Sequence, residues 1–266
     1  IKDLGQSFHT GKQSEGSSDV VFDVLDKGTA EHKIQKQIDT YQTPIVQLSQ
    51  VDFKYDAADT YALKNINLSI YQGEKIALVG KSGAGKSTLA QLITQNYKPQ
   101  SGSITFKDPS LSIGFLSQSP YIFNASIRDN ITMFQDVDDA RILKVLDDVG
   151  LKEKVLSLAD GLDTWIGEGG EMLSGGQMRR IELSRVLMTQ PELIIFDEPA
   201  TGLDVKTEQT IQDVIAHEFE SATIITIAHR SHTINKADKR ILIENGYAAS
   251  VEQTTMKNSS QGGDAT

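Results

Sequence analysis

Short apolar runs and longer amphipathic segments alternate along most of the chain. Runs typical of buried strands stand at 75–79, 103–107, 112–117, 192–197, 223–228 and 240–244, and an alternating apolar pattern begins at 45–48. Apolar residues at helical spacing predict helices at 87–94, 138–148, 151–158, 174–189 and 204–219. Because strand and helix patterns take turns, the sequence predicts an α/β fold with a largely parallel sheet and crossover helices.

The strand patterns stop between residues 119 and 185, which predicts a mostly helical subdomain inserted into the α/β core. Residues 1–43 combine a Gly- and Ser-containing stretch, a short apolar patch and a polar run, which is typical of a linker. The small polar residues of 251–266 predict a disordered tail. The folded domain is therefore expected over residues 44–250.

Composition narrows the class of protein. The chain has 266 residues, of which 38% are hydrophobic and 23% charged, as expected for one large α/β domain. The net charge of −10 argues against a nucleic-acid surface, and the absence of cysteine excludes disulfides, thiol nucleophiles and Cys-based metal sites. No apolar run approaches the ~20 residues that cross a bilayer. Because the chain begins at Ile1 instead of Met, we expect it to be a fragment of a longer polypeptide.

A glycine-rich loop follows the strand pattern at 75–79. Its sequence, GKSGAGKST at 80–88, matches the phosphate-binding pattern GxxxxGK[ST], in which glycines let consecutive backbone N–H groups converge on phosphate oxygens. In this pattern a lysine, here Lys86, reaches the β- and γ-phosphates, and the neighbouring hydroxyl of Ser87 can bind Mg²⁺. The candidate nucleotide-binding residues of the loop are Gly80, Lys81, Ser82, Gly83, Ala84, Gly85, Lys86, Ser87 and Thr88.

Polar side chains end three further strand patterns. Asp197 closes the run LIIFD and can hold Mg²⁺, while Glu198 is placed to polarise an attacking water; a solvated acidic strand end is the alternative for Glu198. His229 follows the strand pattern that ends at Ala228, and Gln118 follows the one that ends at Ser117. The Gln118 amide can touch metal or water, or can simply hydrogen-bond at the strand end. Ligands of open α/β sheets bind at the carboxyl ends of strands, so these residues point to one site.

The sequence LSGGQ at 173–177 opens a predicted helix. Ser174 is a suitable N-cap, and a helix N-terminus with two glycines and a hydroxyl forms an anion site. This makes a second phosphate site, which one ATP cannot easily share with the glycine loop of the same chain. Two chains facing each other head to tail would solve this. The residues then expected to contact the partner's ATP are Ser174, Gly175, Gly176 and Gln177.

Together these motifs resemble the nucleotide-binding domain of an ATP-binding cassette (ABC) transporter over about residues 45–250. The resemblance implies a P-loop NTPase core with a mostly parallel sheet, an antiparallel β part near the N-terminus and an inserted helical subdomain. It implies an ATPase with ATP and Mg²⁺ as cofactors, and Glu198, His229, Lys86 and Gln118 as catalytic residues. The metal would be held by Ser87, Gln118 and Asp197.

Two further residues take their role from this resemblance. Tyr55 matches the aromatic residue that stacks on adenine, although core packing is its default interpretation. Asp204 ends the loop that meets the partner domain, but the chain reads TGLD there, where many exporters have SALD. The implied partners are a second nucleotide-binding domain, in a homodimer or heterodimer, and a transmembrane domain of the same polypeptide, with no nucleic acid.

Two segments resemble the exporter branch, namely QSPYIFNASIRDNI at 118–131 and TWIGEGG at 164–170. Residues 1–26 resemble the cytoplasmic end of an exporter's last membrane helix, which implies a place at the cytoplasmic face of a bacterial membrane. LSGGQMRRIEL and PATGLD are similar to the heterodimeric thiol (cysteine or glutathione) exporters of cytochrome bd assembly.

The sequence disfavours two other function classes. A cassette ATPase without a transporter, for DNA repair or translation, would need long coiled coils or twin cassettes, and neither pattern occurs in this sequence. A module that binds ATP without turnover is disfavoured because both Glu198 and His229 are present.

Overall fold

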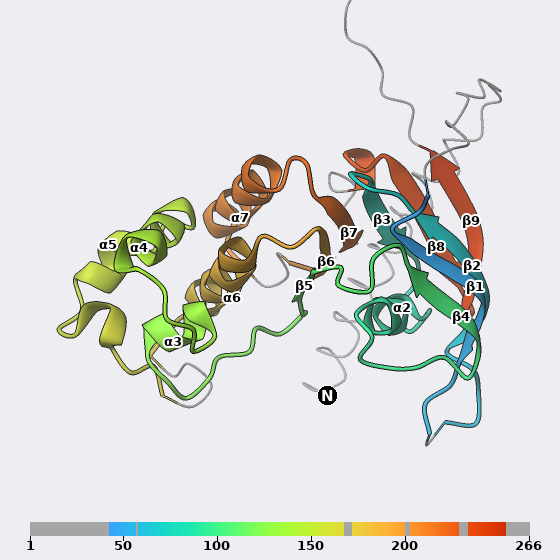
Figure 1. Cartoon of the computed structure of the whole chain (residues 1–266), viewed down its shortest axis with the longest axis horizontal. Coiled ribbons are helices and arrows are strands. Elements are labelled where there is room, and N and C mark those ends of the chain that lie inside the picture. The colour runs from blue at the N-terminus through green and yellow to red at the C-terminus, as the bar shows by residue number, and fades with distance from the viewer. Residues whose placement is uncertain (1–42, 57, 168–171, 200–202, 229–233, 254–266) are drawn as a thin grey trace, which may run out of the picture.

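The computed structural model describes residues 43–56, 58–167, 172–199, 203–228 and 234–253. Its elements, labelled in Figure 1, follow in the order β1 (Val46–Phe53), β2 (Leu63–Ile70), β3 (Lys75–Val79), α2 (Lys86–Ile93), β4 (Ser101–Phe106), β5 (Ile113–Leu116), α3 (Ile127–Thr132), α4 (Asp139–Asp148), α5 (Lys152–Leu156), the 3₁₀ helix η1 (Gly161–Asp163), α6 (Gly175–Thr189), β6 (Leu193–Asp197), α7 (Val205–Glu218), β7 (Thr223–Ile227), β8 (Lys239–Glu244) and β9 (Tyr247–Gln253). The predicted α/β fold with a mostly parallel sheet is confirmed.

The larger sheet has six strands in the order β5-β6-β7-β3-β8-β9. All neighbouring pairs are parallel except β8 and β9, which pair antiparallel. β6 shows why its sequence is apolar without interruption: Leu193 and Ile195 enter the core on the α2 face, and Ile194 and Phe196 enter the core on the opposite face. A parallel sheet covered on both sides needs such strands.

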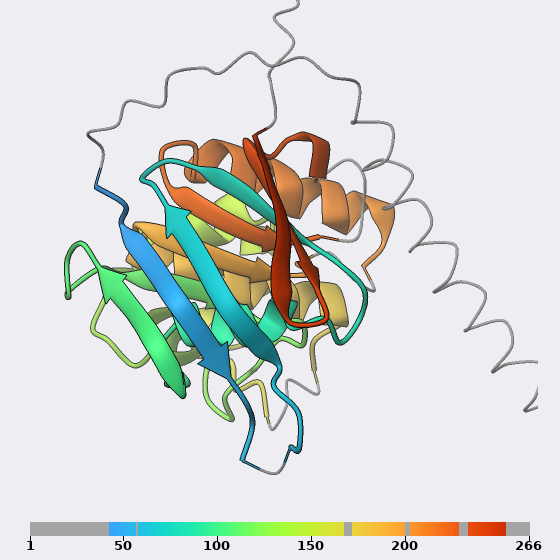
Figure 2. The ribbon, with the colours of Figure 1, turned by 90° about the vertical axis from the view of Figure 1, so that its right-hand side faces the viewer.

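A second, antiparallel sheet of three strands, in the order β2-β1-β4, lies over the α2 face. Figure 2 views this sheet face-on, with β1 and β2 in front of the remainder of the domain. Helix α2 contributes Leu89, Leu92 and Ile93 to a core that also contains residues of β1, β2, β3, β6 and β8. The helix that begins at the glycine loop is therefore held between two sheets, which fixes the position of the loop.

The elements described between residues 119 and 185 are helical, apart from one isolated bridge between Ser126 and Trp165. Helices α3, α4 and α5 and the 3₁₀ helix η1 gather at one end of the molecule and pack toward α6 (Figure 1). Their apolar residues share one core with α6, α7 and the face of the sheet opposite α2. Helix α6 thus belongs to the helical subdomain and also lies against the α/β core.

Four described elements were absent from the sequence-based prediction: β2, α3, the 3₁₀ helix η1 and β9. β9 also continues to Gln253, so the tail predicted over 251–266 begins at least three residues too early. Residues 1–42 of the expected linker and 254–266 of the expected tail lie outside the described residues. Within the described part of the chain, none of the helices combines the length and apolarity that crossing a membrane requires.

Candidate functional site

The glycine loop connects β3 to α2, as the sequence predicts. Lys86 is the first residue of α2 and is only 6% exposed. Its Nζ donates to the carbonyl oxygens of Gly80 and Lys81, each at 2.9 Å, so the lysine folds back across its own loop. Lys81, Ser82, Gly83 and Ser87 are exposed. The loop therefore presents a fixed ammonium group and accessible backbone N–H groups at the N-terminus of a helix, which is an anion site.

Two glycines of the loop are required by close contacts with the backbone of other segments. A Cβ at Gly80 (φ +143°) would lie 2.2 Å from the carbonyl oxygen of Ile243 in β8. A Cβ at Gly85 (φ +110°) would lie 2.7 Å from the carbonyl oxygen of Ala62. Both φ values are ones that residues with a side chain rarely adopt. The phosphate loop is therefore wedged between β8 and the segment before β2.

The acidic pair lies where β6 ends, beside the loop. Asp197 is buried at the carboxyl end of β6, and the half-buried Glu198 follows it. Burial lowers the pKa of Lys86, whereas the charges of Glu198 and Asp197 raise it, which places both carboxylates within electrostatic reach of the lysine. The Nε2 of Gln118 donates to Oε2 of Glu198 at 3.2 Å. The structure thus brings together Lys86, Asp197, Glu198 and Gln118.

Glu198 has an unusual backbone. Its φ is +50°, a left-handed conformation that non-glycine residues seldom adopt, and Pro199 follows it and restricts it further. Its N–H donates to the carbonyl oxygen of Ile227 in β7 at 3.3 Å. Strain of this kind costs about 1–3 kcal/mol and clusters at functional sites. The strained turn places the Glu198 side chain beside Gln118 instead of continuing the strand.

Tyr55 lies next to the phosphate loop, although it precedes the loop by many residues. Its hydroxyl forms a 2.9 Å hydrogen bond with Oγ1 of Thr88 in the first turn of α2. Its ring makes edge contacts with Phe53, at 4.9 Å between centroids, and with Tyr97, at 5.5 Å. Tyr55 is 38% exposed, whereas Phe53 is buried. Phe53 thus has the packing role, and Tyr55 presents an aromatic surface to solvent beside the loop.

The sequence LSGGQ at 173–177, called the signature sequence below, forms the start of α6. Ser174 is the N-cap: its Oγ accepts from the N–H of Gln177 at 3.3 Å, and Oε1 of Gln177 accepts from the N–H of Ser174 at 2.9 Å. This reciprocal pair is a capping box, which fixes the helix end. Ser174 and Gly175 are exposed. The predicted helix start is confirmed, and its remaining free N–H groups point out of the domain.

Asp204 caps the neighbouring helix α7 in the same manner. Its carboxylate accepts from the N–H of Thr207 at 3.0 Å and from the Thr207 hydroxyl at 2.7 Å. The hydrogen bonds from Thr207 lower the pKa of Asp204. A Cβ at Gly176 would lie 3.1 Å from Cγ2 of Thr207, so the two helix starts are in contact. The residues predicted to reach a partner's ATP therefore form one surface.

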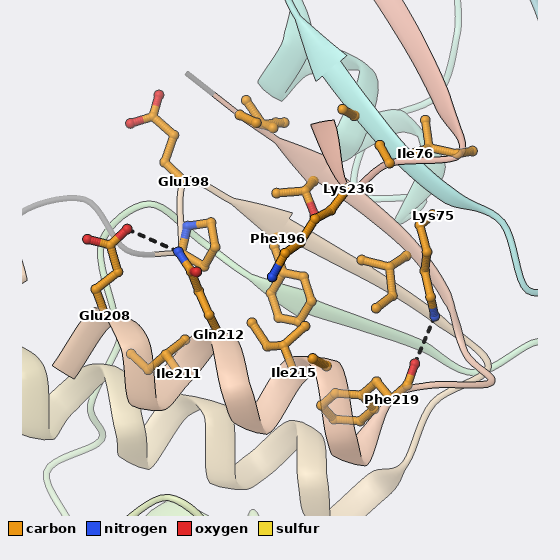
Figure 3. Close-up of a pocket in the computed structure, with 18 of the residues that line it drawn as sticks. Lys75, Ile76, Phe196, Glu198, Glu208, Ile211, Gln212, Ile215, Phe219 and Lys236 are labelled. Carbon is orange, nitrogen blue, oxygen red and sulfur yellow. Dashed lines mark hydrogen bonds between the residues drawn. The ribbon is translucent and has the colours of Figure 1, made fainter. Parts of the chain in front are cut away.

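A cavity adjoins the site at Glu198. It has a volume of about 350 Å³ and lies between α7 and the face of the sheet opposite α2 (Figure 3). Glu198 stands at one end of the cavity, and Lys75 stands at the other. The Nζ of Lys75 donates at 2.8 Å to the carbonyl oxygen of Phe219, the C-cap residue of α7. Burial lowers the pKa of Lys75. None of residues 80–88 is among the described residues that line the cavity, so it is not a phosphate pocket.

The sequence-predicted residues thus fall into two groups on one chain. One group consists of the glycine loop and the strand ends beside it, and the other consists of the starts of α6 and α7. His229 lies outside the described residues, as do residues 168–170 of the segment TWIGEGG. The prediction missed a polar network in which Arg179 of α6 donates to the carbonyl oxygens of Ser117 and Gln118 and pairs with Glu182. Opposite charges three residues apart, on the helix face that also carries the buried Val186, were the available signal.

A family comparison decides what this arrangement is. Residues 63–201 match the family model described as ABC transporter, a span that includes the glycine loop, Gln118, the signature sequence and Glu198. The chain belongs to the ABC transporter family. It is the ATPase domain of that family, so residues 80–88 are its Walker A loop and residues 173–177 its signature motif.

Similar proteins in this family are named as transporters or flippases. The chain is 32% identical, over 92% of its length and 45% of the relative's, to the glutathione/L-cysteine transport system ATP-binding/permease protein CydC of Haemophilus influenzae. It is 36% identical, over 85% of its length and 41% of the relative's, to an ATP-dependent lipid A-core flippase of Idiomarina loihiensis. A bacterial Atm1-family ABC exporter with ATP bound superimposes with a TM-score of 0.72 at 29% identity, over 94% of this chain and 46% of that one. The chain spans less than half the length of these relatives.

Proposed function

We propose that two such domains pair head to tail, so that each ATP lies between the Walker A loop of one and the signature motif of the other. The observation that carries this proposal is that both anion sites are built and exposed. Ser82 and Ser87 of the loop and Ser174 and Gly175 of the helix start all reach solvent. Each site offers only one side of a nucleotide pocket, and a second domain supplies the other side.

Hydrolysis at this shared site would rest mainly on positioning and on charge stabilisation at the γ-phosphate. Lys86 would bind the β- and γ-phosphates, and Glu198 would accept a proton from the attacking water. Gln118, which already contacts Glu198, would orient that water. We assign His229 to the same γ-phosphate by its place after β7, and Tyr55 to the adenine ring by its exposed surface beside α2.

The oxygen donors of the site suit Mg²⁺. Asp197 ends β6, the Ser87 hydroxyl lies in the first turn of α2, and Gln118 supplies an amide oxygen. The described residues contain no cluster of three or more His, Cys, Asp or Glu that could hold a metal by themselves. Mg²⁺ usually takes one or two carboxylates together with phosphates and water, so the donor set fits an ion carried by the nucleotide. Bound there, Mg²⁺ would neutralise phosphate charge.

An aromatic patch on the helical subdomain supports attachment to a transmembrane domain. The patch consists of Tyr121, Phe123, Phe134 and Trp165, of which Tyr121 is 64%, Phe134 62% and Trp165 58% exposed. The three phenyl rings contact one another in series, and Trp165 donates to Asn124 at 2.8 Å. Exposed apolar patches of this kind mark interaction sites. Tyr121, Phe123 and Trp165 lie in the segments that resemble exporters, and Phe134 follows the first of these segments.

We therefore propose that residues 44–253 are the ATPase domain of an exporter, since β9 continues to Gln253, with residues 1–43 as the link from a membrane domain and residues 254–266 as a tail. The domain would work at the cytoplasmic face of a bacterial membrane. The relatives named above move different cargoes, a thiol system and lipid A-core, so the proposal stops at export. A cassette ATPase without a transporter has no support among these relatives.

The test uses Glu198→Gln, which removes the proton acceptor but keeps a side chain of the same shape. With MgATP, this variant is expected to retain nucleotide and to run as a dimer in size-exclusion chromatography with light scattering. Lys86→Ala is the control, because it removes the phosphate contact and should lose both retention and pairing. A Glu198→Gln chain that stays monomeric at every concentration, alone and with any similar domain as its partner, would contradict the shared site.

A further inference from the structure

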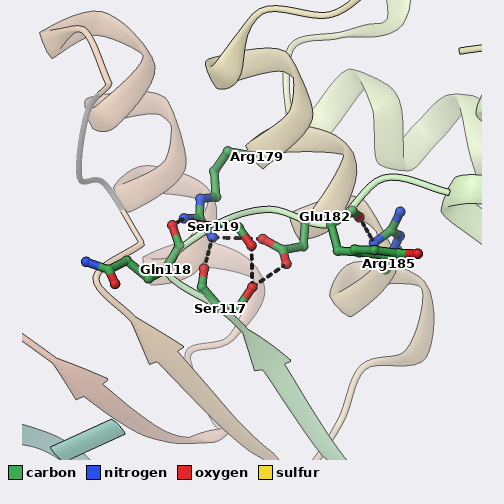
Figure 4. Close-up of polar contacts among 7 residues, drawn as sticks. Ser117, Gln118, Ser119, Arg179, Glu182 and Arg185 are labelled. Carbon is green, nitrogen blue, oxygen red and sulfur yellow. Dashed lines mark hydrogen bonds and ion pairs between the residues drawn. The ribbon is translucent and has the colours of Figure 1, made fainter. Parts of the chain in front are cut away.

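Arg179 and Glu182 form an ion pair inside the domain, on the inner face of the signature helix α6. The side chains are 2% and 8% exposed, and Nη1 of Arg179 lies 2.8 Å from Oε2 of Glu182 (Figure 4). For both residues, burial is the largest cause of the pKa change: it lowers the pKa of Arg179 and raises that of Glu182. Such a pair is a poor source of stability, because desolvation opposes the attraction.

The pair instead holds a specific piece of backbone. The Arg179 guanidinium donates to the carbonyl oxygens of Ser117 and Gln118, the two residues that follow β5. The Ser117 hydroxyl lies 3.3 Å from Oε1 of Glu182 and donates to the carbonyl oxygen of Ser119 at 2.6 Å. The planar guanidinium can satisfy two carbonyls and a carboxylate at once, which a lysine cannot do in a fixed geometry.

These contacts join two parts of the molecule that serve different nucleotides in the proposed dimer. Arg179 is on the helix whose first residues contact the partner's ATP. Gln118, whose carbonyl it holds, donates through its side chain to Glu198 of the chain's own site. The chain of contacts therefore runs from α6 through Arg179 and the backbone of residues 117–118 to Glu198.

We propose that the Arg179–Glu182 pair is a positioning device that fixes the backbone at Ser117 and Gln118 to the signature helix and so places Gln118 against Glu198. Neither residue of the pair touches the nucleotide. Its effect is on the geometry of the hydrolytic side chains, and through α6 it links that geometry to the partner's site. This role rests on the function proposed above.

The test is the double substitution Arg179→Met with Glu182→Leu (R179M/E182L). Replacing both members by apolar side chains removes one buried charge of each sign. Arg185, whose pKa is lowered by burial and raised by Glu182, keeps its hydrogen bonds to Asn130 and to the carbonyl oxygen of Tyr121, so the domain is expected to fold. The control is K144M/D148L, which removes a more exposed ion pair from a different helix, α4. The first measurement compares hydrogen exchange of the segment 114–120 between wild type and the two variants without nucleotide. The second measures exchange of the wild-type segment 80–88 with and without Mg²⁺ and a non-hydrolysable ATP analogue.

R179M/E182L is expected to exchange at 114–120 about tenfold faster than wild type, while K144M/D148L matches wild type. In the assembly where the wild type turns over ATP, kcat should fall about tenfold and KM for ATP should change less than about twofold, because positioning and not binding is lost. Unchanged exchange at 114–120, or faster exchange with wild-type kcat, overturns the proposal. If the wild-type segment 80–88 gains no protection from nucleotide, that result would instead count against the proposed function. The comparison at 114–120 is made without nucleotide, so its outcome does not depend on the proposed function.

Discussion

At the residue scale, two glycines of the Walker A loop have positive φ but different surroundings. A Cβ at Gly80 would meet the backbone of Ile243, whereas a Cβ at Gly83 (φ +76°) has nothing within 4 Å. Gly83→Ala should therefore cost only the left-handed strain, about 1–2 kcal/mol of unfolding free energy. Gly80→Ala must also separate β3 from β8 and should cost about 3 kcal/mol or more.

Urea unfolding measures both free energies, and the two variants serve as controls for each other because they lie in the same loop. Equal losses would show that the contact between Gly80 and Ile243 does not constrain the loop. The expected difference is large enough to exceed the error of linear extrapolation, which is about 10–15%.

The same scale shows which site residues the sequence could predict. Lys86, Asp197, Glu198 and Gln118 were predictable because each stands at a strand end or in a motif, and parallel strands bring such ends to one edge. The structure confirms that these four lie together. The partners of Arg179 were not predictable, because they are backbone carbonyls far away in the sequence and carbonyls leave no trace in residue identity.

At the element scale, strongly periodic helices and uninterrupted apolar strands were predicted within a few residues, and weakly patterned ones were missed. β2 escaped because Asn65 adopts φ +48° and the register against β1 shifts between Ile66 and Leu63, which interrupts the alternation. β9 was missed because none of its residues is buried and its apolar residues, Tyr247, Ala248, Ala249 and Val251, do not alternate. Both strands form through pairing with neighbours rather than through their own pattern.

The start of α7 gives a pH-dependent prediction. Hydrogen bonds from Thr207 lower the native pKa of Asp204 below its value in the unfolded chain. Because the native state favours the ionised carboxylate, the stabilisation is complete above the unfolded pKa of about 4 and is lost as the pH falls through the lowered native pKa. Asp204→Asn keeps an acceptor for the cap but has no titration.

Urea midpoints of the nucleotide-free chain, taken from about pH 6 to about pH 3, should therefore fall further for the wild type than for Asp204→Asn. Other carboxylates titrate in both proteins and cancel in the comparison. A difference between the two midpoints that stays constant over this range would exclude a lowered pKa at Asp204.

At the scale of the whole molecule, the sheet order brings four strand ends to one edge, while the starts of α6 and α7 contact each other through Gly176 and Thr207. The order of motifs along the chain predicted this fold well, since each motif implies the element that carries it. The large cavity behind Glu198 could not be predicted, because a gap between α7 and the sheet depends on how three elements pack and not on any one pattern.

The division of the site between two surfaces predicts complementation between two defective chains. Lys86→Ala destroys only the Walker A loop, and Ser174→Asp keeps the N-cap of α6 while setting a negative charge against the γ-phosphate. In a Glu198→Gln background neither chain alone should retain ATP. If the two chains are joined at random into covalent pairs before MgATP is added, half of the pairs are mixed, each with one intact site of two, so retention should rise toward about a quarter of the unmixed Glu198→Gln level.

The sharper comparison puts both defects on one chain. When a chain with Lys86→Ala and Ser174→Asp is joined at random, in equal amounts and before MgATP is added, to a chain that has neither, every site of the mixed pairs lacks one half, and retention should fall to about a quarter. If instead each chain bound ATP with its own residues only, the intact chains would keep their nucleotide in any pairing and retention would be about one half. Gel filtration with radiolabelled ATP separates the two values, and a result near one half would exclude a site completed in trans.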